Sequence, residues 1–97
     1  MPRRARRTDS NHAEIRDGLR QAGADVTDLS GIGGGIPDLI VEMFGVRAWV
    51  DCKAAGGRET KAQLELWPRL PGAVFVAHDV EEAVWKMKEL AQLGVTL

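Results

Sequence analysis

The chain of 97 residues has little cysteine and no long apolar run. Its single cysteine, Cys52, excludes an intramolecular disulfide and a zinc site built from several cysteines. We therefore expect a reducing compartment, the cytoplasm. No apolar run approaches the ~18 residues that a membrane-spanning helix needs, so we expect no membrane partner. The N-terminus also lacks the apolar segment of a secretory signal, and we expect none.

The net charge of −1 conceals an uneven distribution. Four of the thirteen basic residues lie in the first seven positions: Arg3, Arg4, Arg6 and Arg7. The remaining nine basic and all fourteen acidic residues follow, which gives a net charge of −5. We interpret residues 1–8 as a flexible basic arm that contacts DNA phosphates, or as a solubilising tail. Residues 9–97 are expected to form a single acidic domain, which fits an enzyme whose carboxylates bind cations.

Apolar spacing and turn residues predict an α/β domain. A helix is expected to begin near residues 9–11 and to end before Gly23, which suits a C-cap. A second helix should begin near Thr60 and end before Pro68, because the residue before a proline avoids helical geometry. The predicted order is helix, three strands, helix, strand, helix. The strands are expected at 24–30, 38–44, 47–53 and 73–77, and the last helix at 80–93.

The most informative residues lie on the predicted hairpin. Side chains alternate along a strand, so Asp51 and Lys53 share one face. A two-residue turn at Gly45 and Val46 would place Asp38 opposite Lys53, on that same face. The hairpin therefore predicts a cluster of two carboxylates and an ammonium group. The simpler alternative is an exposed Asp–Lys pair that contributes a few tenths of a kcal/mol.

Such a cluster fits a divalent metal ion. Mg²⁺ and Mn²⁺ favour oxygen ligands and Mg²⁺ retains several waters, so two carboxylates and one carbonyl suffice. Asp38, Asp51 and the backbone carbonyl of Cys52 are the predicted ligands. Lys53 would orient the attacking water or offset negative charge in the transition state. This chemistry indicates hydrolysis of a phosphodiester bond.

Two further polar residues each allow a catalytic and a structural interpretation. Glu14 either projects from the first helix towards the metal or forms a capping box with Asn11. Gln63 either positions the water or Lys53, or completes a capping box with Thr60. The two histidines are isolated, and we expect each to be a surface or satisfied side chain: His12 and His78.

The glycine tract at 31–35 matches neither a Walker motif nor a dinucleotide-binding motif, because a strand follows it. We expect Gly34 and Gly35 to let a DNA backbone approach Asp38 closely. Arg58 and Lys61, at the start of the second helix, either contact phosphates or are solvated surface charges.

Taken together, these residues resemble the PD-(D/E)xK nuclease superfamily and, within it, the VRR-NUC family. The resemblance covers most of the chain. It rests on Glu14, Ile36-Pro37-Asp38, Asp51-Cys52-Lys53, Gly57-Arg58, Thr60-Lys61-Ala62-Gln63 and the final strand–helix unit. It implies a restriction-endonuclease-like αβββαβα core, in which helices flank a mixed central sheet. It also implies a Mg²⁺- or Mn²⁺-dependent DNA endonuclease whose catalytic residues are Glu14, Asp38, Asp51, Lys53 and Gln63. Metal binding is then assigned to Asp38, Asp51 and the Cys52 carbonyl, with Glu14 acting through water.

One departure from the family is Asp51, where glutamate is more usual; the shorter side chain would alter metal preference or rate. Small members resemble homodimers that cut branched DNA such as four-way (Holliday) junctions in bacterial or phage-infected cells. A chain this small can cut two strands symmetrically only as a C2 pair. The alternatives are a non-catalytic protein that binds DNA junctions and a structural protein without affinity for nucleic acid.

Overall fold

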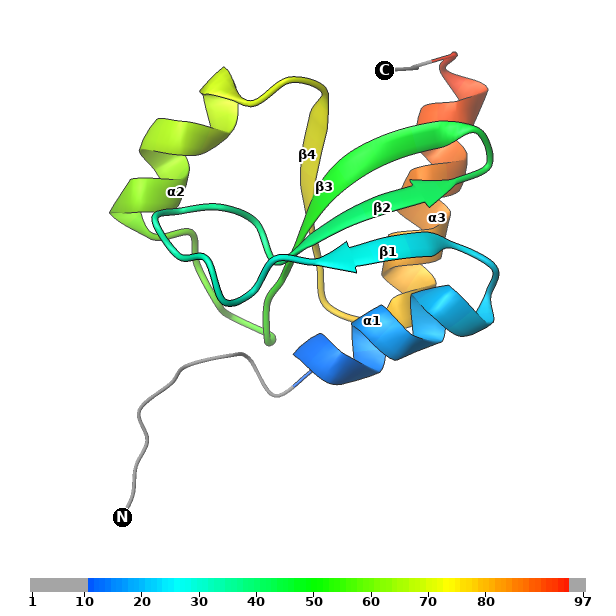
Figure 1. Ribbon diagram of the computed structural model, residues 1–97, viewed down its shortest axis with the longest axis horizontal. Helices are drawn as coiled ribbons and strands as arrows, with labels where there is room; N and C mark the ends of the chain where they lie inside the picture. The colour runs from blue at the N-terminus through cyan, green and yellow to red at the C-terminus, as the bar shows by residue number, and fades with distance from the viewer. Residues whose placement is uncertain (1–10, 95–97) are drawn as a thin grey trace.

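The computed structural model describes residues 11–94, in which four strands form one mixed sheet (Figure 1). The strands lie in the order β1-β2-β3-β4. β1 pairs antiparallel with β2 and β2 antiparallel with β3, whereas β4 runs parallel to β3. Their bounds are β1 Asp25–Asp28, β2 Leu39–Met43, β3 Val46–Cys52 and β4 Ala73–Ala77.

Three α-helices complete this α/β domain, and the elements follow the order predicted from the sequence. A short 3₁₀ helix, η1, continues α2 because Pro68 cannot extend the α-helical hydrogen-bond ladder. Across residues 11–94, none of the helices is both long and apolar enough to span a membrane. The helices are α1 His12–Gln21, α2 Lys61–Leu66, η1 Trp67–Arg69 and α3 Val80–Gln92.

The core lies between one face of the sheet and the pair α1 and α3. Alternate residues of the strands point into it, as the period of two requires. α1 and α3 approach closely at Gly18, where an added Cβ would lie 2.4 Å from Val80 Cγ2. α2 lies apart from both helices, on the other side of the strands (Figure 1). The core includes Ile15, Leu19, Leu39, Val41, Ala48, Val50, Cys52, Ala77, Ala83 and Met87.

The hairpin turn differs from the predicted one. Its two central residues are Phe44 (φ 57°) and Gly45 (φ 79°), and Leu39 pairs with Val50. Positive φ at both central residues is the geometry that twisted two-residue hairpins favour. Continuing this register by one residue places Asp38 opposite Asp51, so the predicted pairing of Asp38 with Lys53 is wrong. The error amounts to two residues along β3, which keeps every side chain on its predicted face.

The start of α1 is attached to the ends of two strands. Asn11 Nδ2 donates to the carbonyl oxygens of Lys53 (3.0 Å) and His78 (2.8 Å). Because this side chain makes no helix-capping hydrogen bond, the capping box considered for Asn11 and Glu14 does not form. Asn11 instead ties the helix to the ends of β3 and β4.

The loop between β1 and β2 runs beside α2 (Figure 1). The Trp67 indole N–H donates to the Gly35 carbonyl at 2.8 Å. Gly35 has φ 91°, and an added Cβ would lie 2.7 Å from the Ala62 carbonyl oxygen. Gly35 was expected to admit a DNA backbone, but its missing side chain admits the backbone of α2. Gly34 also has positive φ, and it is exposed to open space.

Substitution at these two glycines should separate backbone strain from close packing. An alanine at either position would have to adopt positive φ. We therefore expect Gly34→Ala to lower the free energy of unfolding by about 1 kcal/mol. Gly35→Ala should cost roughly 2 kcal/mol more, because its Cβ also displaces α2. Urea unfolding of both variants measures the difference, and equal losses would show that the contact with Ala62 has no energetic weight.

Candidate active site

Two aspartates meet where β2 begins and β3 ends. The Asp38 N–H donates to Asp51 Oδ1 at 3.2 Å. The Cys52 N–H in turn donates to Asp38 Oδ2 at 2.9 Å. Asp51 is only 2% exposed, whereas Asp38 is partly open to solvent. The Cys52 side chain packs in the core on the opposite face, as predicted. The register therefore brings two carboxylates together at one end of the hairpin.

Lys53 and Gln63 close a hydrogen-bonded network around Asp51. Lys53 Nζ lies 2.9 Å from Asp51 Oδ2 and 2.9 Å from Gln63 Oε1. Gln63 Nε2 donates to Asp51 Oδ2 at 3.3 Å. All three residues are buried, with Lys53 8% and Gln63 9% exposed. Burying an ion pair costs free energy unless further hydrogen bonds support it. Gln63 supplies one such hydrogen bond to Lys53 and one to Asp51.

Gln63 combines the two roles that the sequence left as alternatives. Its backbone N–H donates to Thr60 Oγ1 at 3.1 Å, and its Oε1 accepts the Thr60 N–H at 2.9 Å. The capping box is therefore complete. Because the same Oε1 also accepts a hydrogen bond from Lys53, the cap of α2 fixes the position of the ammonium group.

Asp38 carries the perturbed carboxyl of the site. Burial raises its pKa to about 6, and the negative charge of Asp51 adds to this shift. The hydrogen bond from the Cys52 N–H and the proximity of His12 oppose it. Because the Asp38 carboxyl resists ionisation beside the Asp51 carboxylate, binding of a proton or a cation between them is favourable.

His12 is the residue near the site that sequence reasoning missed. It is 6% exposed, and its Nε2 lies 3.3 Å from Asp28 Oδ1. That contact is within ion-pair distance, yet Nε2 has no hydrogen-bond partner within residues 11–94. Burial opposes ionisation of Asp28, but hydrogen bonds from Ser30 and Arg16 lower its pKa overall. His12 precedes Ile15 by three residues on the buried stripe of α1, and this spacing was the available signal.

Glu14 does not join the carboxylate pair. It is exposed, and it lines a hollow between α1 and α3. Within residues 11–94, no group of three or more His, Cys, Asp and Glu side chains is arranged to hold a metal ion. The structure therefore does not place Glu14 where it could coordinate the same ion directly with both aspartates.

The predicted DNA-binding residues fall into three groups. Arg58, Lys61 and Gly34 are exposed, and neither basic side chain forms an ion pair within the described residues. The structure brings Gly35 against α2, as described above. The others lie outside the described residues: Arg3, Arg4, Arg6 and Arg7.

Comparisons with protein-family models, with curated proteins and with solved structures found no match to this chain. Its function must therefore be inferred from the geometry of the site.

The pKa of Asp38 predicts how stability depends on pH in metal-free protein. Because the folded value of about 6 exceeds the usual value near 4, protonated Asp38 contributes stability below pH ~4 that is lost as pH rises through ~6. Asp38→Asn lacks this charge, so it should be more stable than the parent at pH 8, by about 1 kcal/mol after allowance for solvent screening. The two proteins should be similar at pH 4. Urea unfolding in EDTA at both pH values measures this, and an equal gain at both would contradict it.

The double role of Gln63 predicts unequal effects of two substitutions. Thr60→Ala removes the capping hydroxyl and should cost about 1 kcal/mol. Gln63→Ala also removes a hydrogen-bond partner of each member of the buried pair Lys53 and Asp51, so we expect a loss of about 2–3 kcal/mol. Urea unfolding at pH 7 compares them, and equal losses would mean that the bond between Lys53 and Gln63 adds nothing.

Proposed function

We propose that this chain is a Mg²⁺- or Mn²⁺-dependent endonuclease that hydrolyses phosphodiester bonds in DNA. The observation that supports this function is the network of Asp38, Asp51, Lys53 and Gln63. It combines a pair of adjacent carboxylates with a fixed ammonium group at one edge of the sheet. Phosphodiester hydrolysis needs both a site for a cation and a positive charge for the transition state.

The donor set fits a hydrated divalent cation. Asp38 and Asp51 would hold the ion with the Cys52 carbonyl, and water would complete its coordination. Each carboxylate oxygen can accept more than one interaction, so the observed hydrogen bonds leave capacity for a metal. Burial and the neighbouring charge of Asp51 raise the pKa of Asp38, and a bound cation would favour its ionised form. A bound Mg²⁺ or Mn²⁺ would polarise the phosphate and lower the pKa of a bound water.

Lys53 supplies the positive charge that belongs to the protein itself. Its ammonium group has three N–H donors, and its two acceptors within residues 11–94 are Asp51 and Gln63. One N–H therefore stays available for the attacking water or for a phosphate oxygen. Because Gln63 also caps α2, the ammonium group is held in place before substrate binds.

We further propose that the fold is the restriction-endonuclease-like αβββαβα core and that the family is VRR-NUC. The element order and the parallel pairing of β3 with β4 support this assignment. In this chain the shorter Asp51 replaces the usual glutamate, and it still contacts both Lys53 and Gln63. The proposed active site is therefore compatible with aspartate.

The proposed substrate is branched DNA such as a Holliday junction. Arg58 and Lys61 would contact phosphates beside the site, with Gly34 at the adjoining loop, and the arginines before residue 8 would add further phosphate contacts. Each protomer has one site, so symmetric cutting of two strands requires a homodimer. We propose the cytoplasm of a bacterial or phage-infected cell as the location.

A non-catalytic protein that binds DNA junctions is the second candidate. It is favoured by one observation: both Asp51 oxygens already accept hydrogen bonds or an ion pair, and no third acidic or histidine ligand joins the two aspartates within residues 11–94. Such a protein would bind junctions in EDTA and cut in no divalent metal.

Cleavage of labelled four-way junctions and matched linear duplex tests the proposal. We expect cutting of the junction with Mg²⁺ or Mn²⁺ and none with EDTA. Asp38→Asn, Asp51→Asn and Lys53→Met should each lose at least about 100-fold in rate, because each removes a cation ligand or the fixed positive charge. Junction binding in Ca²⁺ should persist in Lys53→Met.

Glu65→Gln, at an exposed position on α2, is the matched control and should cut at the parental rate. Rates that are equal in the parent and in Asp38→Asn would rule out catalysis by this site. Tight junction binding without cleavage in any metal would establish the second candidate instead.

A further inference from the structure

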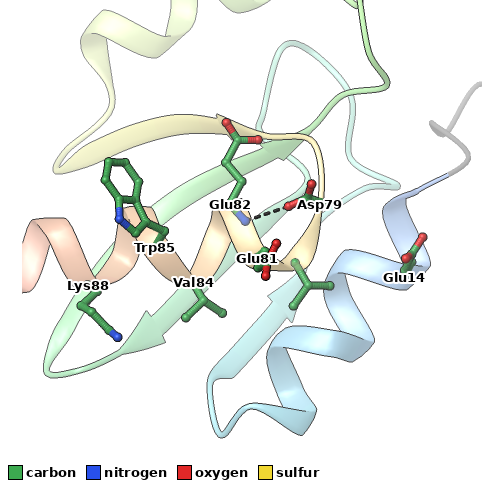
Figure 2. A pocket seen from close by; sticks show the side chains of 8 residues that line it. Glu14, Asp79, Glu81, Glu82, Val84, Trp85 and Lys88 are labelled. Atoms are coloured by element: carbon green, nitrogen blue, oxygen red, sulfur yellow. Dashed lines mark hydrogen bonds between the residues drawn. The ribbon is translucent and has the colours of Figure 1, made fainter.

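A hollow of about 980 Å³ lies between α1 and α3 (Figure 2), and neither aspartate of the site lines it. Its apolar part is formed by Val80, Val84 and Trp85. Trp85 is 59% exposed, which is unusual for so large an apolar side chain. Among residues 11–94, the acidic residues that line the hollow are Glu14, Asp79, Glu81 and Glu82, and Lys88 is its one basic residue.

The acidic side chains of this hollow are only partly neutralised. Glu82 contacts His78 and Lys86, and Asp79 caps α3. Glu14 and Glu81 form no ion pair within residues 11–94. Four carboxylates that line the same hollow as an exposed indole repel the phosphates of DNA and attract a cationic segment. Arginine suits such a surface, because its guanidinium pairs with carboxylates and stacks on aromatic rings.

The chain itself contains a segment of this chemistry. Residues 3–7 include four arginines, and ten residues precede Asn11, where the described structure begins. Glu14, at the hollow, follows Asn11 by about one helical turn. Residues 3 and 7 are eight and four residues from Asn11, so an extended chain reaches roughly 26 Å and 13 Å from it. This reach and the opposite charges favour the chain's own arm over another ligand.

We propose that the arginine-rich segment 3–7 docks in the hollow of its own molecule, with an arginine against Trp85 and others near Glu14 and Glu81. DNA phosphates then compete with these carboxylates for the same arginines. The docking is electrostatic and weakens as salt shortens the range of the attraction. The proposal concerns the arm and the hollow alone, so it stands independently of nuclease activity.

A labelled peptide of residues 1–8 tests the surface. It is titrated by fluorescence anisotropy against the full chain carrying Arg3→Gln, Arg4→Gln, Arg6→Gln and Arg7→Gln, in EDTA without DNA. We expect saturable binding at low salt that weakens at least tenfold at 0.5 M NaCl. Adding Glu14→Gln with Glu81→Gln should weaken binding about tenfold, and adding Trp85→Ala should weaken it several-fold.

The matched control in the same background is Glu59→Gln with Glu65→Gln, which removes the same charge from exposed positions outside the hollow. It should change peptide affinity less than twofold. Equal losses in the two double variants would show attraction to the whole acidic surface, and no loss in either would show binding elsewhere. Both results overturn the proposal.

Occupancy by the chain's own arm has a separate readout. A tethered segment has an effective concentration of about 1 mM, so the native arm should weaken binding of a peptide with a dissociation constant near 0.1 mM roughly tenfold. Equal peptide affinity for the native and arm-neutral chains would overturn intramolecular docking. Because no metal, DNA or cleavage is involved, a failure here is distinguishable from a failure of the proposed nuclease.

Discussion

The buried ion pair between Lys53 and Asp51 is the interaction on which the arrangement of this edge of the sheet depends. Removing two opposite charges from water costs several kcal/mol per ion, and the attraction repays this only when further hydrogen bonds support the pair. Gln63 on α2 provides one such hydrogen bond to each member of the pair, and the capping box holds Gln63. The close approach of Gly35 to Ala62 then becomes necessary, since α2 must lie near enough for its side chain to reach β3.

Asp38 stands in a different electrostatic situation from Asp51, although the two are adjacent. Asp51 has a fixed ammonium partner, whereas Asp38 has a backbone N–H and some solvent. Burial is the main cause of the raised pKa of Asp38, and the negative charge of Asp51 adds to it. The protein therefore keeps one carboxylate compensated and leaves its neighbour in need of a cation, which is a common property of sites that bind metals or transfer protons.

Local patterns were sufficient to predict the elements and their order from the sequence. Alternation placed Asp51 and Lys53 on one face, and the spacing of Thr60 and Gln63 predicted the capping box that forms. The turn was misplaced because Phe44 adopts a positive φ that a phenylalanine rarely takes, so the signal at Gly45 was assigned one residue too late. A register wrong by one residue would have moved the β3 side chains to the opposite face of the sheet. The predicted register was wrong by two residues, so each side chain stayed on its predicted face.

The surroundings of α1 were beyond local patterns. The spacing of His12 from Ile15 indicates that the two share a stripe, but not which residues of other elements each side chain of α1 meets. Only the tertiary structure shows that His12 turns inward beside Asp28 while Glu14 faces the hollow. Asn11 is a similar case, because its partners are 42 and 67 residues away in the sequence.

The two hydrogen bonds of Asn11 attach the start of α1 to the sheet. One amide group bridges the carbonyls at the ends of β3 and β4, beside the backbone hydrogen bond from the Lys53 N–H to the Ala77 carbonyl at 3.1 Å. One of these carbonyls belongs to Lys53 itself. Loss of the Asn11 amide would thus act directly on the backbone that carries the ammonium group.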